Sequence, residues 1–285
     1  MTDHYTRSIS LLRAHDIKEA VQLSTQAGWN QTDADWARLL ELNPESCFLL
    51  RLDGRIAATS TLATFDTELA WVGMVIVDLS HRGKGIGTCM LEKAIRTGQQ
   101  MGYKIIGLDA TEQGRRLYRH YGFHDIKPID RWAGKIRPAG PGNDVHLLEE
   151  RHVHDVVELD LQWCGYDRRK LIQRFFHEKT IQGLGISRDG RLQGFAFLRP
   201  GRQFHHLGPL LAATNEDFTN LLDAATHALH GQSVLVDALR REETSILLKE
   251  RGLTIQRQLM RMTLNEGRKI FNNPELRIAV SFEWG

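Results

Sequence analysis

Met74-Val75-Ile76-Val77 is followed, after a short polar interval, by Arg82-Gly83-Lys84-Gly85-Ile86-Gly87-Thr88. Glycine at alternate positions lets the backbone turn sharply and approach a ligand closely. A helix that begins here presents unpaired N–H groups and the positive end of its dipole, which suits a phosphate, and Arg82 and Lys84 add positive charge. The spacing matches neither the P-loop nor the dinucleotide fingerprint. The segment therefore predicts a phosphate site or, in the plainer interpretation, a glycine-rich turn that enters a helix.

The segments around this loop alternate between strand-like and helix-like patterns. Asp53-Gly54 stands between two strand-like runs and is a hairpin signal. The run 69–77 is nearly all apolar, as in a central strand covered on both faces. The pattern predicts strands over 9–12, 47–52, 56–62, 69–77 and 104–108, and helices over 16–23, from a cap at Thr32 or Asp33 to 40, over 85–101 and over 112–121. This order predicts an α/β fold, in the form of a mixed sheet with helices on it.

A stretch rich in Pro and Gly at 137–142 is the best candidate for a linker. The same alternation of strands and helices returns after it. Ile246 to Leu253 aligns without a gap with Arg116 to Phe123, and Val236-Asp237-Ala238 resembles Leu108-Asp109-Ala110. We therefore expect a duplicated domain, with one copy over 1–137 and the other over 143–285.

Composition excludes several classes of protein. A chain of 285 residues with 41% hydrophobic and 25% charged residues is expected to form an ordered core. The net charge of +2 gives no electrostatic case for nucleic acid, and no apolar run approaches the length of a membrane helix. Cys47, Cys89 and Cys164 suggest neither a disulfide framework nor a zinc site, and the N-terminus lacks a signal-peptide pattern. A cytoplasmic protein without a metal is expected.

The loop and a second segment together resemble a known family. Val75-x-Val77 followed by Arg82-Gly83-Lys84-Gly85-Ile86-Gly87 resembles the acetyl-CoA-binding motif of the GNAT superfamily, R-G-x-G-x-G. Leu117-Tyr118-Arg119-His120-Tyr121-Gly122-Phe123 resembles the L-Y-x-x-x-G-F segment of the same family. The two segments stand in the order that the family has, and the resemblance covers 9–123. It implies an N-acetyltransferase.

The resemblance also implies roles for the residues of the motif. Backbone groups of Val75 and Val77 would pair with the pantetheine arm as an added strand would. Backbone N–H groups from Gly83 to Thr88 would hold the pyrophosphate, and Met74 or Ile76 would approach the thioester. The pantetheine would lie in a wedge where the strands 69–77 and 104–108 separate.

An amine that attacks a thioester needs an acid for the leaving thiolate and a base for its own proton. By resemblance, Tyr118 would lie beside the sulfur and act as the acid; the alternative is a core tyrosine. Asp109 ends the strand beside the wedge and could serve as the base, directly or through water, or could cap the next helix. Glu68 and Asp66 are weaker candidates for the base.

The acceptor site is less well defined by the sequence. Trp29 and Asn30 lie in the turn between the first two helices and could line it, although Trp29 could equally hold the helices together. Trp163, Tyr166 and Arg168 form a second candidate wall. His205-His206 and His152-x-His154 lack the Cys or carboxylate partners of a metal site.

The second copy has lost the features of the first. The segment 212–217, where its cofactor loop is expected, has no glycine or basic residue and carries Glu216 and Asp217. Leu248 stands where Tyr118 stands in the first copy. This half resembles the degenerate C-terminal domain of tandem GNAT proteins, whose role would be to shape the acceptor pocket.

These observations predict an enzyme that transfers an acetyl group from acetyl-CoA to a primary amine of a small molecule. A protein or peptide amine as the acceptor is an alternative. A third possibility is a sensor that binds acetyl-CoA without turnover.

Overall fold

The computed structural model describes residues 9–66, 68–137, 139–265, 271 and 273–285. Contacts divide the chain into two compact units. The first reaches Leu108 and includes Trp284, and the second runs from Asp109 to Glu283 and includes Gly285. Within the described ranges no helix is long and apolar enough to cross a membrane.

The first unit is a mixed sheet in the order β1-β2-β3-β4-β5. Its strands are antiparallel except for β4 and β5, which are parallel. The bounds are Ile9–Leu11 for β1, Cys47–Leu52 for β2, Arg55–Phe65 for β3, Leu69–Val77 for β4 and Ile105–Ala110 for β5, whose last two residues fall in the second unit. The strands β2 and β4 have the bounds that the apolar runs predict, because both are almost entirely buried.

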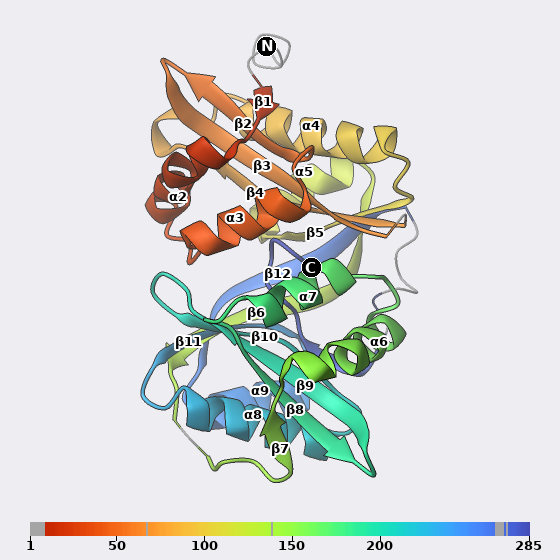
Figure 1. The fold of residues 1–285 in the computed structure, drawn as a ribbon. Coiled ribbons are helices and arrows are strands. Elements are labelled where there is room, and N and C mark those ends of the chain that lie inside the picture. Colours follow the sequence, from red (N-terminus) through yellow and green to blue (C-terminus); the bar gives the residue numbers. More distant parts are fainter. Residues whose placement is uncertain (1–8, 67, 138, 266–270, 272) are drawn as a thin grey trace. The chain divides into compact units, whose positions relative to one another are not determined.

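Helices cover both faces of this sheet (Figure 1). The helices α2 (Ile17–Gln26) and α3 (Asp33–Leu42) pack together on one face, and Thr32 caps α3 as predicted. The helix α4 (Ile86–Gln100) packs on β2, β3 and β4, where the Ser60 hydroxyl donates to the Met90 carbonyl. Short 3-10 turns precede α2 (η1, Ala14–Asp16) and α4 (η2, Leu79–His81).

The second unit is also a mixed sheet, in the order β12-β6-β11-β13-β10-β9-β8-β7 with an additional parallel pairing of β10 and β11. The bounds are Phe123–Lys135 for β6, Val145–Leu147 for β7, Gln182–Arg188 for β8, Arg191–Arg199 for β9, His205–Ala212 for β10, Ser233–Leu239 for β11, Thr254–Leu264 for β12 and Leu276–Ile278 for β13. Its core includes Leu184, Ala196, Leu221, Val236 and Leu248.

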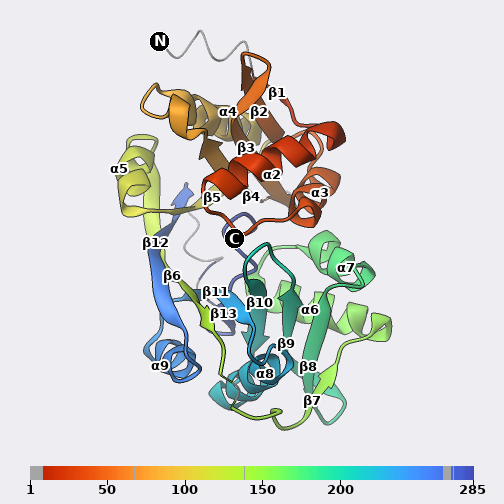
Figure 2. The same cartoon turned by 90° about the vertical axis from the view of Figure 1, so that its left-hand side faces the viewer.

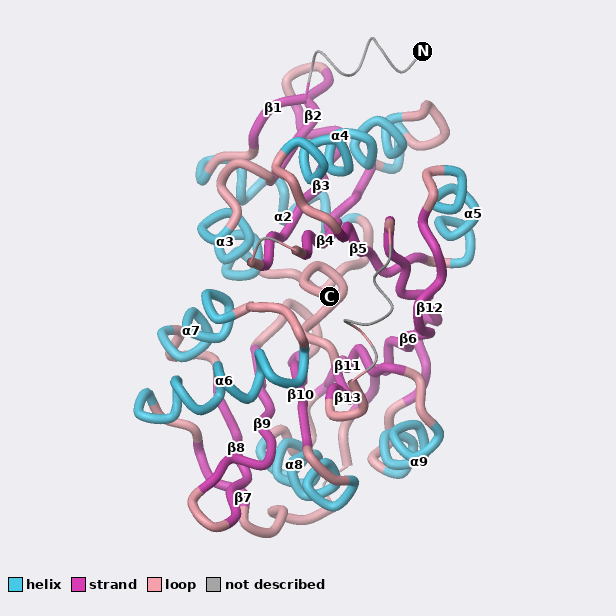
Figure 3. Tube along the Cα trace, turned by 90° about the vertical axis from the view of Figure 1, so that its right-hand side faces the viewer, coloured by secondary structure: helices cyan, strands magenta, loops and turns pink. Residues whose placement is uncertain are grey.

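Its helices lie on opposite faces of the sheet. On one face, Phe175 of α7 (Arg169–His177) packs at a tilt against Phe197 of β9, and α7 packs against α6 (Val153–Cys164), which follows the turn η3 (Glu150–His152). On the other face, Leu221 of α8 (Asn215–Ala228) lies at Gly194 of the same strand. Two further helices, α5 (Glu112–His120) and α9 (Glu242–Glu250), precede β6 and β12; Figure 3 shows α5 beside these two strands.

The strands β6 and β12 relate the two halves of the sequence by an approximate twofold axis. The offset that takes Arg116 to Ile246 also takes Ile129 to Leu259, and these two residues face each other in the β6–β12 ladder. The two register shifts, one on each side of this pair, obey the same offset. Lys127 faces Arg261, and the offset converts Lys127 to Arg257 and Arg131 to Arg261; Arg257 in turn faces Arg131. Figure 2 shows the two strands side by side. The strand that follows the last helix of each half therefore pairs with its counterpart from the other half.

Neither β6 nor β12 is among the strands that the sequence pattern predicts. The pattern correctly predicts a mixed α/β fold that repeats, but it indicates a linker soon after α5 and no strand before that linker. Because β6 pairs with β11 and β12, both from the second half of the sequence, β6 belongs to the second compact unit. The boundary between the two units therefore falls after Leu108.

Candidate functional site

The loop before α4 leaves the helix N-terminus open. Gly83 and Gly85 have positive φ of 75° and 80°, a conformation that favours glycine, and an added Cβ would have open space at both positions. Gly85 is the N-cap residue and carries no capping side chain. The first helical bond runs from the Cys89 N–H to the Gly85 carbonyl at 3.1 Å. The N–H groups of the preceding turn, from Ile86 to Thr88, therefore point out of the helix toward any anion at this end.

Basic side chains surround this N-terminus without ion-pair partners in the described part of the chain. The Arg82 Nε donates to the Val77 carbonyl at 3.1 Å, and the Lys84 Nζ donates to the Ser80 carbonyl at 3.2 Å. Both side chains are otherwise exposed. Asp78 accepts bonds from the Ser80 hydroxyl and N–H, which hold the pKa of its carboxyl below the usual range. Asp78 thus stabilises the loop as a charged cap, and the cations remain available to a phosphate.

The strand β4 carries a bulge beside the loop. Met74 and Val75 lie opposite the single residue Ser60, between the pairs Gly73–Thr61 and Ile76–Thr59. Met74 has a φ of 49°, and the Thr59 hydroxyl donates to its carbonyl at 2.9 Å. A bulge of this kind redirects backbone groups at a strand edge. Met74 and Ile76 are buried, whereas Val75 and Val77 are half-buried.

The strands β4 and β5 pair only along their first residues. Leu69, Ala70 and Trp71 pair with 105–107, and within the described residues the ladder goes no further. Gly107 faces the Trp71 ring so closely that any Cβ there would overlap it. The edge of β4 from Val72 to Val77 is therefore open toward β5, as the expected wedge requires. Gly87 lies over this edge, where an added Cβ would stand 3.3 Å from Val77 Cγ2.

Tyr118 lies on α5 in the second unit. Its ring is tilted against Phe123, with 6.0 Å between centroids, and Gly114 leaves room for it one turn earlier. Burial raises the pKa of the hydroxyl, so Tyr118 keeps its proton at neutral pH. Thr111 caps α5 by accepting from the Gly114 N–H. Thr111, and not Asp109, is therefore the residue that caps α5.

Asp109 forms a buried ion pair that the sequence pattern does not predict. Arg261 of β12 donates through Nε and Nη2 to the two carboxylate oxygens at 3.0 Å each, and both side chains are fully buried. Burial raises the pKa of Asp109, and the charge of Arg261 opposes this shift. The repeat offset, extended past Phe123, takes Arg131 to Arg261 and could have pointed to this residue.

The acceptor candidates lie in different units. Trp29 and Asn30 follow α2 in the first unit, where Trp29 is half-buried and Asn30 is buried. In the second unit, Trp163 is half-buried near the end of α6 and Tyr166 is fully buried. The Tyr166 ring is tilted against Phe271, with 6.0 Å between centroids, and the Phe271 centroid lies 5.3 Å from the Arg261 guanidinium. Tyr166 thus belongs to the same buried cluster as the Asp109–Arg261 pair.

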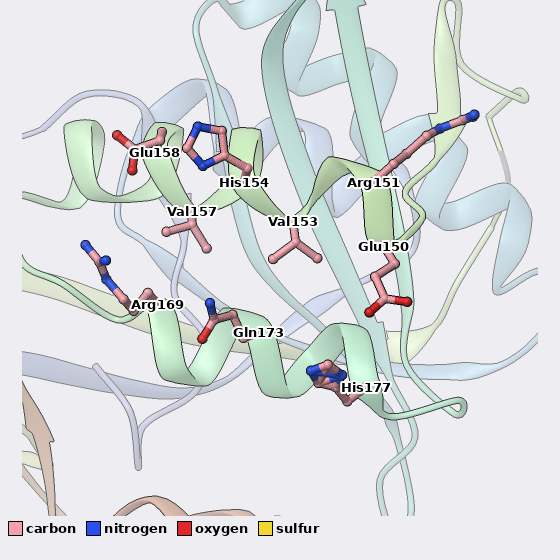
Figure 4. A pocket seen from close by; sticks show the side chains of 9 residues that line it. All are labelled: Glu150, Arg151, Val153, His154, Val157, Glu158, Arg169, Gln173 and His177. Carbon is pink, nitrogen blue, oxygen red and sulfur yellow. The ribbon is translucent and has the colours of Figure 1, made fainter.

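Arg168 completes this cluster. Its Nε and Nη2 donate to the buried carboxylate of Asp160 at 2.7 to 3.0 Å. A separate open groove of about 550 Å³ lies between α6 and α7 (Figure 4). Its rim carries the mostly exposed side chains Glu150, His154, Glu158, Gln173 and His177. Trp163 and Tyr166 do not line this groove.

The helix of the second half that corresponds to α4 is α8, and its N-terminus is capped. Thr214 caps α8 by accepting from the Asp217 N–H at 3.1 Å, and its hydroxyl donates to the Asp217 carboxylate at 2.7 Å. That carboxylate is buried and paired with Arg188. The end of α8 is thus occupied by its own negative charge, unlike the end of α4. Among the described residues, His, Cys, Asp and Glu side chains form no cluster that could hold a metal ion.

Comparison with known proteins places both halves in one superfamily. Residues 14–123 match the model of the acetyltransferase (GNAT) family, and residues 156–275 match that of an acetyltransferase (GNAT) domain. A holothin acyltransferase from Pseudoalteromonas sp. (strain SANK 73390) is 23% identical over 74% of this chain and 71% of its own length.

Solved structures agree in fold over nearly the whole length. A candidate acetyltransferase from Pyrococcus horikoshii has a TM-score of 0.83 at 20% identity, covering 97% of this chain and 95% of its own. A tandem GNAT protein from the clavulanic acid biosynthesis pathway has a TM-score of 0.62 at 14% identity, covering 90% of this chain and 97% of its own. The chain therefore belongs to the GNAT superfamily of acyltransferases and carries two GNAT domains in tandem.

Proposed function

We propose that this acyltransferase moves an acetyl group from acetyl-CoA to a primary amine of a small molecule, by direct attack in a ternary complex. The open N-terminus of α4 is the observation that carries the proposal. Its free N–H groups from Ile86 to Thr88, with Arg82 and Lys84 beside them, suit a pyrophosphate. The capped, acidic end of α8 supports a single cofactor site in the first domain and a degenerate second domain.

The open edge of β4 suits the pantetheine arm. Val75 and Val77 would bond it through their backbones as an added strand, and the bulge at Met74 would direct backbone groups toward the thioester. Met74 and Ile76 would line the reacting end. Acetyl-CoA would supply the activated acyl group, and side chains of this protein would donate and accept the protons.

The proton steps fall to Tyr118 and Asp109 in this proposal. As the neutral amine forms its N–C bond and the C–S bond breaks, the Tyr118 hydroxyl gives its proton to the departing sulfur. The raised pKa of Tyr118 keeps that proton available at neutral pH. Asp109, directly or through water, would take the proton that the amine loses, and its raised pKa makes it a stronger base than an exposed aspartate.

A small-molecule acceptor is supported by the names of similar proteins. One relative is a holothin acyltransferase, and one structural neighbour comes from clavulanic acid biosynthesis. Trp29, Asn30, Trp163 and Tyr166 remain our candidates for the acceptor wall. The three cysteines are buried thiols, which agrees with a cytoplasmic setting.

A thermal-shift titration with acetyl-CoA tests the cofactor site. At a hundredfold excess over Kd, binding adds about 2.7 kcal/mol to the free energy of unfolding, so Tm should rise by several degrees. Gly85→Ala should abolish most of this rise, because alanine strains the left-handed cap that opens the helix end. Gly54→Ala is the matched control, because Gly54 has a φ of 77° and equally open space but lies in the β2–β3 hairpin. Equal acetyl-CoA responses in the two variants would contradict the proposal.

A screen of amines for CoA release then identifies the acceptor and tests the sensor alternative. Tyr118→Phe should lower kcat by about a hundredfold while the acetyl-CoA shift persists, because only the acid is removed. Tyr103→Phe, on a half-buried tyrosine before β5, controls for loss of a hydroxyl. If acetyl-CoA stabilises the wild type but neither small amines nor peptides release CoA, the sensor alternative replaces this function.

A further inference from the structure

Two equivalent buried ion pairs join the halves of the sequence within the second unit. Asp109 of β5 pairs with Arg261 of β12, and Asp237 of β11 pairs with Arg131 of β6 through Nε and Nη2 at 2.7 Å each. Arg131 and Arg261 correspond under the repeat offset, and the two aspartates correspond once that offset is shortened by two residues. Each aspartate is thus paired with an arginine from the strand that follows the last helix of the other half.

We infer that Arg261 is a positioning residue for the first domain, contributed by the second, and that it fixes the Asp109 carboxylate for its part in amine acetylation. The inference rests on the proposed function of Asp109. One guanidinium nitrogen binds each carboxylate oxygen, which sets the plane of the carboxylate while each oxygen keeps a second lone pair. That lone pair is the one that an amine or a water can use.

The other pair serves as an internal control. Asp237 and Arg131 have the same bidentate geometry, but α9 carries Leu248 where α5 carries Tyr118. The Asp237 carboxylate also has His206 Nε2 at 3.6 Å. With leucine in place of the tyrosine, this pair connects the halves without a part in the chemistry. Loss of Arg131 therefore measures the structural cost of breaking such a pair.

Charge predicts a pH effect that is larger for loss of Arg261 than for loss of Arg131. The groups that act on Asp109 are Arg261 and Arg131, which favour its charged form, and Asp237, which disfavours it. Removal of Arg261 takes away the largest of the favourable charges, so the pKa of Asp109 should rise further. The acid limb of the kcat profile should then move to higher pH.

The test compares Arg261→Met with Arg131→Met in the intact chain, using the amine found in the screen. Arg261→Met should lower kcat by about tenfold or more, because a misplaced reacting group costs rate, with the KM for acetyl-CoA unchanged. Arg131→Met should lower Tm by a similar amount and leave kcat within about twofold. Asp109→Asn combined with Arg261→Met should be no slower than Asp109→Asn alone, because Arg261 acts through that carboxylate. The double variant also removes both buried charges, which protects against misfolding.

Three results would overturn the inference: equal kcat losses in Arg261→Met and Arg131→Met, additive losses in the double variant, or an unmoved acid limb. Titration of the Asp109 carboxyl by ¹³C NMR provides a readout without turnover, and its midpoint should rise in Arg261→Met. A wild type that binds acetyl-CoA but acetylates no amine would instead contradict the proposed function. The two failures are therefore distinguishable.

Discussion

At the scale of single residues, the two aspartates at equivalent positions differ in their neighbours. His206 lies beside Asp237 and is buried. Burial, together with the charges of Arg199 and Arg131, holds the pKa of this imidazole well below its usual range. The native protein therefore keeps His206 neutral under conditions in which the unfolded chain protonates it.

This difference predicts an acid-sensitive stability. Below the ordinary histidine pKa of about 6.5, the unfolded state binds a proton that the native state does not, so the free energy of unfolding falls as pH falls. His206→Gln should flatten this dependence by up to about 1.4 kcal/mol per pH unit, because glutamine does not titrate. Urea unfolding of both proteins at several pH values between 5 and 7.5 measures the difference. Parallel stability curves would show that His206 is protonated in the native state as well.

At the scale of elements, the divergence of β4 and β5 depends on one contact. Gly107 has no room for a Cβ because the buried Trp71 ring fills that space, and the ladder ends at this pair. Gly107→Ala should destabilise the protein by about 1–3 kcal/mol through overpacking. Because the shifted ring would disturb the open edge of β4, the thermal shift with acetyl-CoA should also shrink.

Trp71→Leu is the companion variant for this prediction. Leucine removes the ring atoms that the methyl group introduced by Gly107→Ala would meet, so the double variant should cost less than the sum of the two single changes. Urea unfolding of the four proteins gives this coupling. If the two changes in the free energy of unfolding are simply additive, the contact between Gly107 and Trp71 is not what makes Gly107→Ala destabilising.

Elements also differ in how far the sequence could predict them. The loop 82–87 and the strand β4 follow from local chemistry, since glycines open the turn and an apolar run makes a central strand. The strand β6 cannot be predicted from local chemistry in this way. Its buried positions include Asp130 and Arg131, and charged residues of this kind usually lie on the surface. They are buried because Arg240 and Asp237, more than a hundred residues away, pair with them. Arg261 escaped prediction for the same reason, since its partner Asp109 is 152 residues away.

At the scale of the whole molecule, the exchange of β6 and β12 between the halves resembles a dimer joined into one chain. The Ile129–Leu259 pair marks the twofold position of the β6–β12 ladder, and Arg131 and Arg261 reach equivalent aspartates around it. Exchange of identical elements between copies is a low-cost route to dimers. A tandem chain whose halves have diverged can retain this arrangement, while only one half keeps an open helix N-terminus.

This symmetry predicts the behaviour of the first half alone. A fragment of residues 1–140 ends at Gly140, in the segment between β6 and β7, and exposes β6 without β11 and β12. Two copies can pair their β6 strands about Ile129, and Arg131 of each copy can then bind Asp109 of the other, as Arg261 does in the intact chain. Sedimentation equilibrium should therefore give a dimer. Ile129→Lys should prevent it, because the buried Ile129 of each copy lies on the axis and two lysines there would repel. A folded, monomeric wild-type fragment would show that β6 needs the diverged sequence of β12, and that the exchange is specific to the tandem chain.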